Sequence, residues 1–198
     1  MNGVQRYFAP TGLAAALAAL AHPGGATVLA GGTDLMPQSH AGRVPARPTL
    51  LNIRHVEGLA RVTVEGDALV LGTLVTITTL REHALVRTHA PLLAAAAERF
   101  ASAQVRNAAT LGGNLCNASP AADTATPLLA LDAEVELASL DDDGEVLARR
   151  LPLAEFFVGP GRTRRAAAEL LTAVRVPLAA PGPRGETLSI DIAWLGAA

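Results

Sequence analysis

The chain has 198 residues, half of them apolar, and a formal net charge of −2. That length is enough for one compact domain or for two small lobes that share an interface. All 16 basic residues are arginine, which excludes a phosphate loop of the GK[ST] type and Schiff-base chemistry by lysine. The arginines are spread along the chain without interleaved aromatic residues, a distribution that argues against nucleic-acid binding.

Other bulk features argue against metal sites and membrane spans. The single cysteine, Cys116, cannot form an internal disulfide, and with five scattered histidines it does not build a cysteine-type zinc site. The start "MNGVQRYFAP" lacks an apolar signal core, and no run approaches the roughly 20 apolar residues of a membrane span. We therefore expect a soluble, cytoplasmic protein without a metal site. Few aromatic residues among much Ala, Leu and Val favour a mixed α and β fold.

Residues 1–57 are expected to form a small βαβ lobe. Thr11 is placed to cap a helix whose leucines at 13, 17 and 20 share one face, and "HPGG" ends that helix. Strands are predicted at 26–30 and 49–53, and "GGTDL" follows the earlier strand directly.

Residues 58–178 are expected to form a larger α+β lobe built on an antiparallel sheet. Two β-rich runs around "EGDA" predict a hairpin, and "AEVELASLDDDGEVLARR" predicts another whose turn is Asp141 to Gly144. Its three aspartates are interpreted as a solvated tip rather than as a metal site. Helices at 79–87 and from Pro91 onward precede a glycine-rich loop. A strand is predicted at 169–177, and 179–198 form a linker and tail.

A double glycine occurs twice, in "LAGGTDL" at 29–35 and in "TLGGNL" at 110–115. A glycine pair lets the main chain approach a ligand and aims several N–H groups at one anion without any lysine. Both segments are therefore candidates for holding a pyrophosphate. Further polar groups suited to the ligand and to its sugar or ribityl hydroxyls come from Thr33, Thr110, Asn114, Ser119 and Asp123.

Each glycine pair also has a purely structural interpretation. Both can be tight turns, with Asp34 and Ser119 as helix caps and Asp123 as a charge in the first helical turn. Two such segments with polar followers in one chain favour the ligand-binding interpretation. Cys116 is interpreted as a small apolar filler rather than a nucleophile, because no histidine lies near it in sequence.

Four segments, in this order and spacing, resemble the FAD-binding medium subunit of the molybdenum hydroxylases. They are "AGGTDLMP", "QVRNAATLGGNLCNASPAADTATPLLALDAEVEL", "EFFVGPGRT" and "ELLTAVRVP". The family includes the flavoprotein subunits of carbon monoxide dehydrogenase and bacterial xanthine dehydrogenase. The resemblance covers residues 1–177, and it implies a two-lobed FAD-binding fold of the vanillyl-alcohol-oxidase and MurB-like (PCMH) type, with the flavin between the lobes.

The resemblance also implies particular cofactor contacts. The first pyrophosphate segment corresponds to Leu29, Ala30, Gly31, Gly32, Thr33, Asp34 and Leu35, and the second to Thr110, Gly112, Gly113 and Asn114. Asp123 matches an aspartate that contacts the cofactor, Phe100 an aromatic residue that packs on the adenine, and Leu171 a leucine that covers the flavin ring. No catalytic residue is assigned to the chain.

The sequence after Pro177 departs from the family pattern. The family carries a lysine near the flavin, then "DIA" and a separate C-terminal domain. This sequence keeps Asp191, Ile192 and Ala193, is shorter before them, lacks the lysine and then stops. The isoalloxazine side of the site is thus expected to be incomplete, with Arg184 as a candidate replacement for the missing charge.

The resemblance implies an electron-transfer subunit with non-covalent FAD. Its partners would be a large molybdopterin subunit and a small subunit with two [2Fe-2S] clusters, and a dimer of such heterotrimers is one assembly that this allows. Electrons would pass from molybdenum through the clusters to the flavin, and then to NAD⁺, oxygen or a quinone. Two alternatives stay open: an assembly module that has lost FAD, and a self-contained flavin oxidase.

Overall fold

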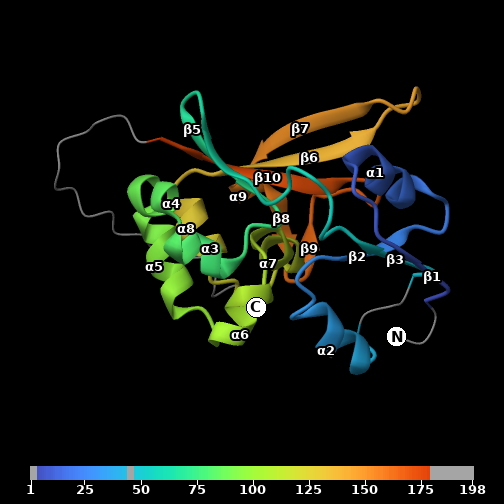
Figure 1. The fold of residues 1–198 in the computed structure, drawn as a ribbon, viewed down its shortest axis with the longest axis horizontal. Coiled ribbons are helices and arrows are strands. Elements are labelled where there is room, and N and C mark those ends of the chain that lie inside the picture. The colour runs from blue at the N-terminus through green and yellow to red at the C-terminus, as the bar shows by residue number, and fades with distance from the viewer. Residues whose placement is uncertain (1–3, 44–46, 179–198) are drawn as a thin grey trace.

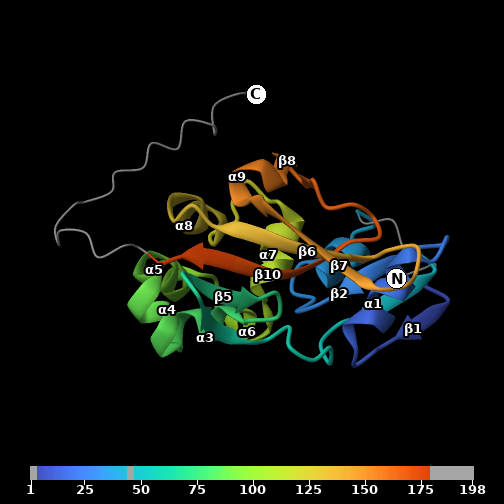
Figure 2. The same ribbon diagram turned by 90° about the horizontal axis from the view of Figure 1, so that it is seen from above.

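The computed structural model describes residues 4–43 and 47–178. Within them the chain forms a small parallel sheet, a five-stranded antiparallel sheet and a two-stranded hairpin. Figure 1 shows most of the helices beneath the five-stranded sheet on the left of the view, and the small sheet on the right. The view from above in Figure 2 shows the same arrangement, with the large sheet lying across the helices.

The small sheet is parallel, as expected from a βαβ pattern. Its strands, in spatial order, are β1 (Arg6–Phe8), β3 (Thr49–Asn52) and β2 (Ala26–Leu29). Helix α1 (Leu13–Ala21) connects β1 to β2, and α2 (Leu35–His40) follows β2. The predicted helix and both predicted strands are confirmed. The prediction that Thr11 caps this helix is wrong, because Gly12 occupies the N-cap position.

The large sheet is antiparallel and has β10 at its centre. Its strands, in spatial order, are β4 (Val62–Glu65), β5 (Ala68–Gly72), β10 (Leu170–Pro177), β6 (Glu134–Leu140) and β7 (Val146–Pro152). Both predicted hairpins and the last predicted strand are confirmed. In the β6–β7 turn the Asp141 carboxylate accepts the N–H groups of Asp143 and Glu145, so this aspartate stabilises the turn.

Helices fill the long connection between β5 and β6. They are α3 (Ile77–Glu82), α4 (Ala84–His89), α5 (Pro91–Arg99), α6 (Ala103–Ala108), α7 (Leu111–Asn117) and α8 (Ala125–Ala130). The predicted single helix at 79–87 is wrong. His83 has an extended backbone, and its Nδ1 accepts the N–H of Leu85, so the chain ends α3 there and starts α4. The short elements α9 (Leu153–Phe156), β8 (Phe157–Gly159) and β9 (Arg162–Thr163) lead to β10.

Two apolar cores hold these layers together. The larger packs β5, β6 and β10 against the helices, and its fully buried side chains include Leu69, Leu71, Leu80, Leu93, Leu111, Leu115, Leu128 and Phe156. The smaller joins the two sheets, because it contains Leu51 of β3 and Leu17 of α1 together with Ala138 of β6 and Leu170 of β10. Side chains of both sheets therefore share one core.

The division of the chain at residue 57 stays a prediction. The small sheet ends at Asn52 and the large sheet begins at Val62, so the strands fall on the expected sides of that boundary. The predictions for residues 179–198, among them those for Arg184 and Asp191 to Ala193, lie outside the described residues. In the described part of the chain, no helix is long and apolar enough to cross a membrane.

An ion pair braces the approach to β10. Glu169 is almost buried, and its carboxylate accepts from Nε and Nη2 of Arg149 at 2.5 and 2.8 Å and from the N–H of Ala166 at 2.7 Å. The Arg149 guanidinium, which contributes most, holds the pKa of Glu169 below its ordinary value of 4.5. β7 and the segment before β10 are thus fastened to each other.

We predict that Glu169→Gln lowers the free energy of unfolding by about 1–3 kcal/mol at pH 7, because a charge-assisted hydrogen-bond pair is lost. The pKa of Glu169 is lower in the folded chain than in the unfolded one. The stabilisation is therefore present above pH 4.5 and is lost as the pH falls through the folded value. Urea unfolding at pH 7 and pH 3 measures the difference.

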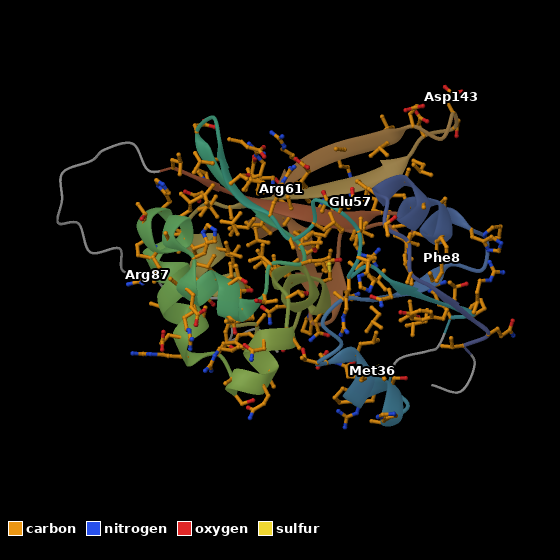
Figure 3. The ribbon with its side chains drawn as sticks, in the orientation of Figure 1. Phe8, Met36, Glu57, Arg61, Arg87 and Asp143 are labelled. Carbon is orange, nitrogen blue, oxygen red and sulfur yellow. The ribbon has the colours of Figure 1, made fainter. Side chains whose placement is uncertain are left out.

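The control is Glu57→Gln, at an exposed carboxylate on the loop after β3 that Figure 3 labels. This substitution should change the unfolding free energy by less than about 0.5 kcal/mol. A Glu169→Gln effect of equal size at both pH values would show that the ion pair does not contribute.

Candidate functional site

The earlier glycine segment begins where β2 ends. Strands β2 and β3 run parallel with Leu29 opposite Asn52, and the N–H of Ile53 donates to the Leu29 carbonyl at 3.0 Å. After Leu29 the chain leaves the sheet and turns into α2. Gly32 has a φ of +76°, in the left-handed region where glycine is favoured.

The N–H groups of this segment are available to a ligand. Within the described residues, the N–H groups of Gly31, Gly32, Thr33 and Asp34 have no backbone or side-chain acceptor. Gly31, Gly32 and Thr33 are half-buried and Asp34 is exposed. Backbone N–H groups away from solvent are almost always paired, so this row of unpaired ones indicates a site for water or for an anion.

The later glycine segment is a helix rather than the expected loop. Thr110 caps α7, and both glycines lie in its first turn. The N–H groups here are already bonded: Leu111 donates to Val75, Gly112 to Thr73, and Gly113 to the Thr110 hydroxyl. Asn114 donates to the Thr110 carbonyl. The interpretation that both pairs aim free N–H groups at an anion therefore stays open only for the earlier pair.

Two glycines are required by close packing of the main chain. A Cβ on Gly31 would lie 2.1 Å from the carbonyl oxygen of Ala108, so the earlier segment crosses directly over the residues that precede α7. A Cβ on Gly112 would lie 1.7 Å from Oγ1 of the buried Thr73. Gly113 differs, because a Cβ there would meet only the Thr110 hydroxyl, at 2.9 Å.

These segments enclose a cavity of about 730 Å³. Ligand pockets have volumes of about 300–1,000 Å³ and commonly lie between structural layers. All the predicted cofactor residues except Leu29 line it: Ala30, Gly31, Gly32, Thr33, Asp34, Leu35, Phe100, Thr110, Gly112, Gly113, Asn114, Ser119, Asp123 and Leu171. The structure thus brings together residues from the small sheet, the helices and β10.

The polar residues of this cavity have different local roles. Asp34 occupies the N-cap position of α2, as the structural interpretation expects, but its carboxylate accepts from Gln38 and makes no capping hydrogen bond. The Ser119 hydroxyl accepts the N–H of Ala121 in a turn, which is not a helix cap. The buried Thr124 hydroxyl donates to Oδ1 of Asn114 at 2.5 Å, which leaves the Asn114 amide N–H groups for a ligand.

Arg47 and Arg165 also line the cavity, and neither is predicted as a site residue from the sequence. The guanidinium of Arg165 donates to the carbonyls of Ala166 and Glu169 at 3.1 and 2.6 Å, while the Glu169 carboxylate pairs with Arg149. The positive charge of Arg165 is therefore held in the wall beside a carboxylate that another arginine neutralises. No local motif marks it, because Arg165 reaches the cavity through the β9–β10 connection.

Cys116 is a half-buried residue in the same wall. Burial raises the pKa of its thiol above the ordinary value of 9.0, and the charge of Arg165 opposes part of that rise. A thiol with a raised pKa is protonated at neutral pH and is a poor nucleophile. Within the described ranges, no group of three or more His, Cys, Asp and Glu side chains is arranged to hold a metal ion.

Comparisons with known proteins agree with this geometry. A family model described as the FAD binding domain in molybdopterin dehydrogenase matches residues 2–179. The xanthine dehydrogenase FAD-binding subunit of Escherichia coli O157:H7 is 37% identical over 166 residues, which cover 83% of this chain and 55% of the relative. Caffeine dehydrogenase subunit beta of Pseudomonas sp. (strain CBB1) is 36% identical over 174 residues, or 87% of this chain and 57% of the relative.

A solved structure of carbon monoxide dehydrogenase from Hydrogenophaga pseudoflava superposes with a TM-score of 0.82 and 30% identity, covering 90% of this chain and 61% of that chain. The chain belongs to the family of FAD binding domains of molybdopterin dehydrogenases. The predicted two-lobed FAD-binding fold is confirmed. The chain spans little more than half the length of the relatives that it matches.

We predict that Gly112→Ala is less stable than Gly113→Ala by about 1–3 kcal/mol, because only the methyl group at 112 overlaps the buried Thr73. Both substitutions gain similar helix propensity, so that contribution cancels in the comparison. Urea unfolding of the two variants without added FAD gives the difference. Equal stability would show that the contact with Thr73 does not require a glycine.

Proposed function

We propose that this chain is the FAD-binding electron-transfer subunit of a molybdopterin-dependent hydroxylase or dehydrogenase. The observation that carries the proposal is the row of unpaired N–H groups at Gly31 to Asp34, which borders a cavity large enough for a cofactor. Family membership supports the same cofactor.

The residues of the cavity suit the different parts of FAD. The N–H groups of Gly31 to Asp34 and the hydroxyl of Thr33 would donate to the diphosphate. The positively charged Arg165 borders the same cavity. Gly113 presents a bare backbone surface, where a phosphate group can approach closely. The amide of Asn114 and the carboxylate of Asp123 are suited to sugar or ribityl hydroxyls.

Apolar side chains supply the remaining walls. Phe100 and Leu171 are almost fully buried members of the larger core, and both also border the cavity. Side chains fixed by core packing offer rigid apolar surfaces for the adenine and for the flavin ring. We assign Phe100 to the adenine and Leu171 to the flavin, as the family resemblance implies.

Bound flavin would accept electrons singly and release them in pairs, while this chain supplies binding and electrostatics. We propose a large molybdopterin subunit and a small subunit with two [2Fe-2S] clusters as partners. Electrons would arrive from the clusters and leave to NAD⁺, oxygen or a quinone. The substrate would be hydroxylated in the molybdopterin subunit.

Two rival functions predict different absorbance spectra. An assembly module that has lost FAD would show no flavin bands, and the unpaired N–H groups of the earlier glycine segment disfavour it. A self-contained flavin oxidase would be reduced by a small substrate without partners. The proposed function requires flavin that stays oxidised until the iron–sulfur partner is added and reduced.

We predict that Gly113→Val abolishes FAD binding, weakening it by at least about 100-fold, whereas Cys116→Ser retains it. A Cβ at 113 would lie 2.9 Å from the Thr110 hydroxyl, which has to shift, and the rest of the valine side chain would occupy the cavity, while the thiol of Cys116 serves only as volume. The measurement is flavin absorbance retained after gel filtration with excess FAD.

Flavin attachment is expected to be non-covalent, so acid precipitation of the wild-type chain should leave all FAD in the supernatant. Flavin that stays in the pellet would overturn this expectation. Equal loss of FAD in Gly113→Val and Cys116→Ser would show that this part of the cavity does not contact the cofactor.

A further inference from the structure

Arg54 grips the outer side of the earlier glycine segment. Its Nε donates to the carbonyl of Ala30 at 2.6 Å, and its Nη2 donates to the carbonyl of Gly31 at 2.7 Å. The parallel register explains the contact, because Ala30 follows β2 and Arg54 follows β3 at the same edge of the small sheet. A planar guanidinium can hold two neighbouring acceptors at once.

The hydrogen bonds from Arg54 to these two carbonyls set the direction of two N–H groups. The chain has no cis peptide bond among its described residues, and in a trans peptide the C=O and N–H groups point in opposite directions. The Ala30 carbonyl shares its peptide plane with the N–H of Gly31, and the Gly31 carbonyl shares one with the N–H of Gly32. Both N–H groups therefore point away from Arg54.

Gly31 packs closely against the Ala108 carbonyl, but no other hydrogen bond within the described residues fixes the direction of these two planes. The carbonyl of Gly32 accepts the N–H of Met36, and that of Asp34 accepts the N–H of Gln38, so α2 fixes only the later part of the segment. Two consecutive glycines are the residues whose peptide planes rotate most freely. The fork from Arg54 supplies the hydrogen bonds that set the rotation of these planes.

We propose that Arg54 is a positioning residue that holds the N–H groups of Gly31 and Gly32 ready for the diphosphate of FAD. The inference rests on the proposed function. Arg54 itself is exposed and does not border the cavity, so it acts through the glycine segment rather than by touching the cofactor. Because Arg54 orders the loop before the ligand binds, less conformational entropy is lost on binding, and affinity rises without a new contact to the ligand.

The test compares Arg54→Gln, Arg54→Lys and a control, Arg87→Gln. Arg87 is exposed on α4, and Figure 3 shows it at the opposite side of the molecule from Met36, which packs next to Gly32. Calorimetric titration gives the affinity of each variant for FAD and for ADP, which carries the diphosphate without a flavin. The ³¹P NMR spectrum of bound FAD reports the diphosphate environment, and urea unfolding reports stability.

We expect Arg54→Gln to bind FAD and ADP at least about tenfold more weakly, with a change in the ³¹P shifts and an unfolding midpoint close to that of the wild type. Arg54→Lys should remain weak, because an ammonium group is a poor substitute for a planar fork on two carbonyls. Arg87→Gln should match the wild type.

Three results would overturn this inference without affecting the proposed function. They are wild-type affinity in Arg54→Gln, full rescue by lysine, which would show a direct charge effect, and unchanged ³¹P shifts with all loss of binding explained by loss of stability. If Arg54→Gln does not fold, the ³¹P shifts of bound FAD in Arg54→Lys decide whether Arg54 positions the N–H groups or only stabilises the fold. A wild-type chain that binds no FAD would instead overturn the proposed function together with this inference.

Discussion

The main chains of two distant segments cross at Gly31, and the cavity exists because they do. No side chain fits at this position, since a Cβ would lie 2.1 Å from the Ala108 carbonyl oxygen. The crossing brings the end of β2 against the residues that precede α7. It thus places the N–H groups of the small sheet's loop opposite the helix that carries Asn114 and Cys116.

The two glycine pairs look alike in sequence but have different tasks. At α7 the N–H groups are bonded to Thr73, Val75 and Thr110, so this pair contributes close packing through Gly112 and open space through Gly113. At the end of β2 the N–H groups are unpaired, and Arg54 holds the carbonyls on the other side. One segment therefore offers donors, and the other offers a surface on which a ligand can lie.

Sequence patterns predicted much of the fold because most helices and strands are marked by short-range signals, such as turn residues and the spacing of apolar residues. The β6–β7 hairpin has a turn sequence between two β-rich runs, and α1 has leucines at helical spacing with a proline and glycines after it. The break between α3 and α4 was not predictable from propensity, because it depends on a hydrogen bond from Leu85 to the His83 ring. The helical state of the later glycine pair depends on pairing with Thr73 and Val75, which lie far away in sequence.

The site was predictable to a similar extent and for similar reasons. The residues assigned by resemblance gather around one cavity, with Leu29 as the exception, but their contacts with FAD stay predictions. Arg54 and Arg165 went unnoticed, because each acts through a pairing that only the folded chain creates. Arg54 needs the parallel register of β2 and β3, and Arg165 is held by the main-chain carbonyls of Ala166 and Glu169 ahead of β10.

Amide hydrogen exchange, followed residue by residue by NMR during a titration with FAD, is the most direct test of the two glycine segments. It shows whether FAD binds the N–H groups of the earlier segment and not those of the later one. We predict that FAD slows exchange strongly at Gly31 to Asp34. The amides of Leu111 to Gly113, which are already bonded within the protein, should change little. Strong new protection at Gly112 and Gly113, with none at Gly31 to Asp34, would contradict it.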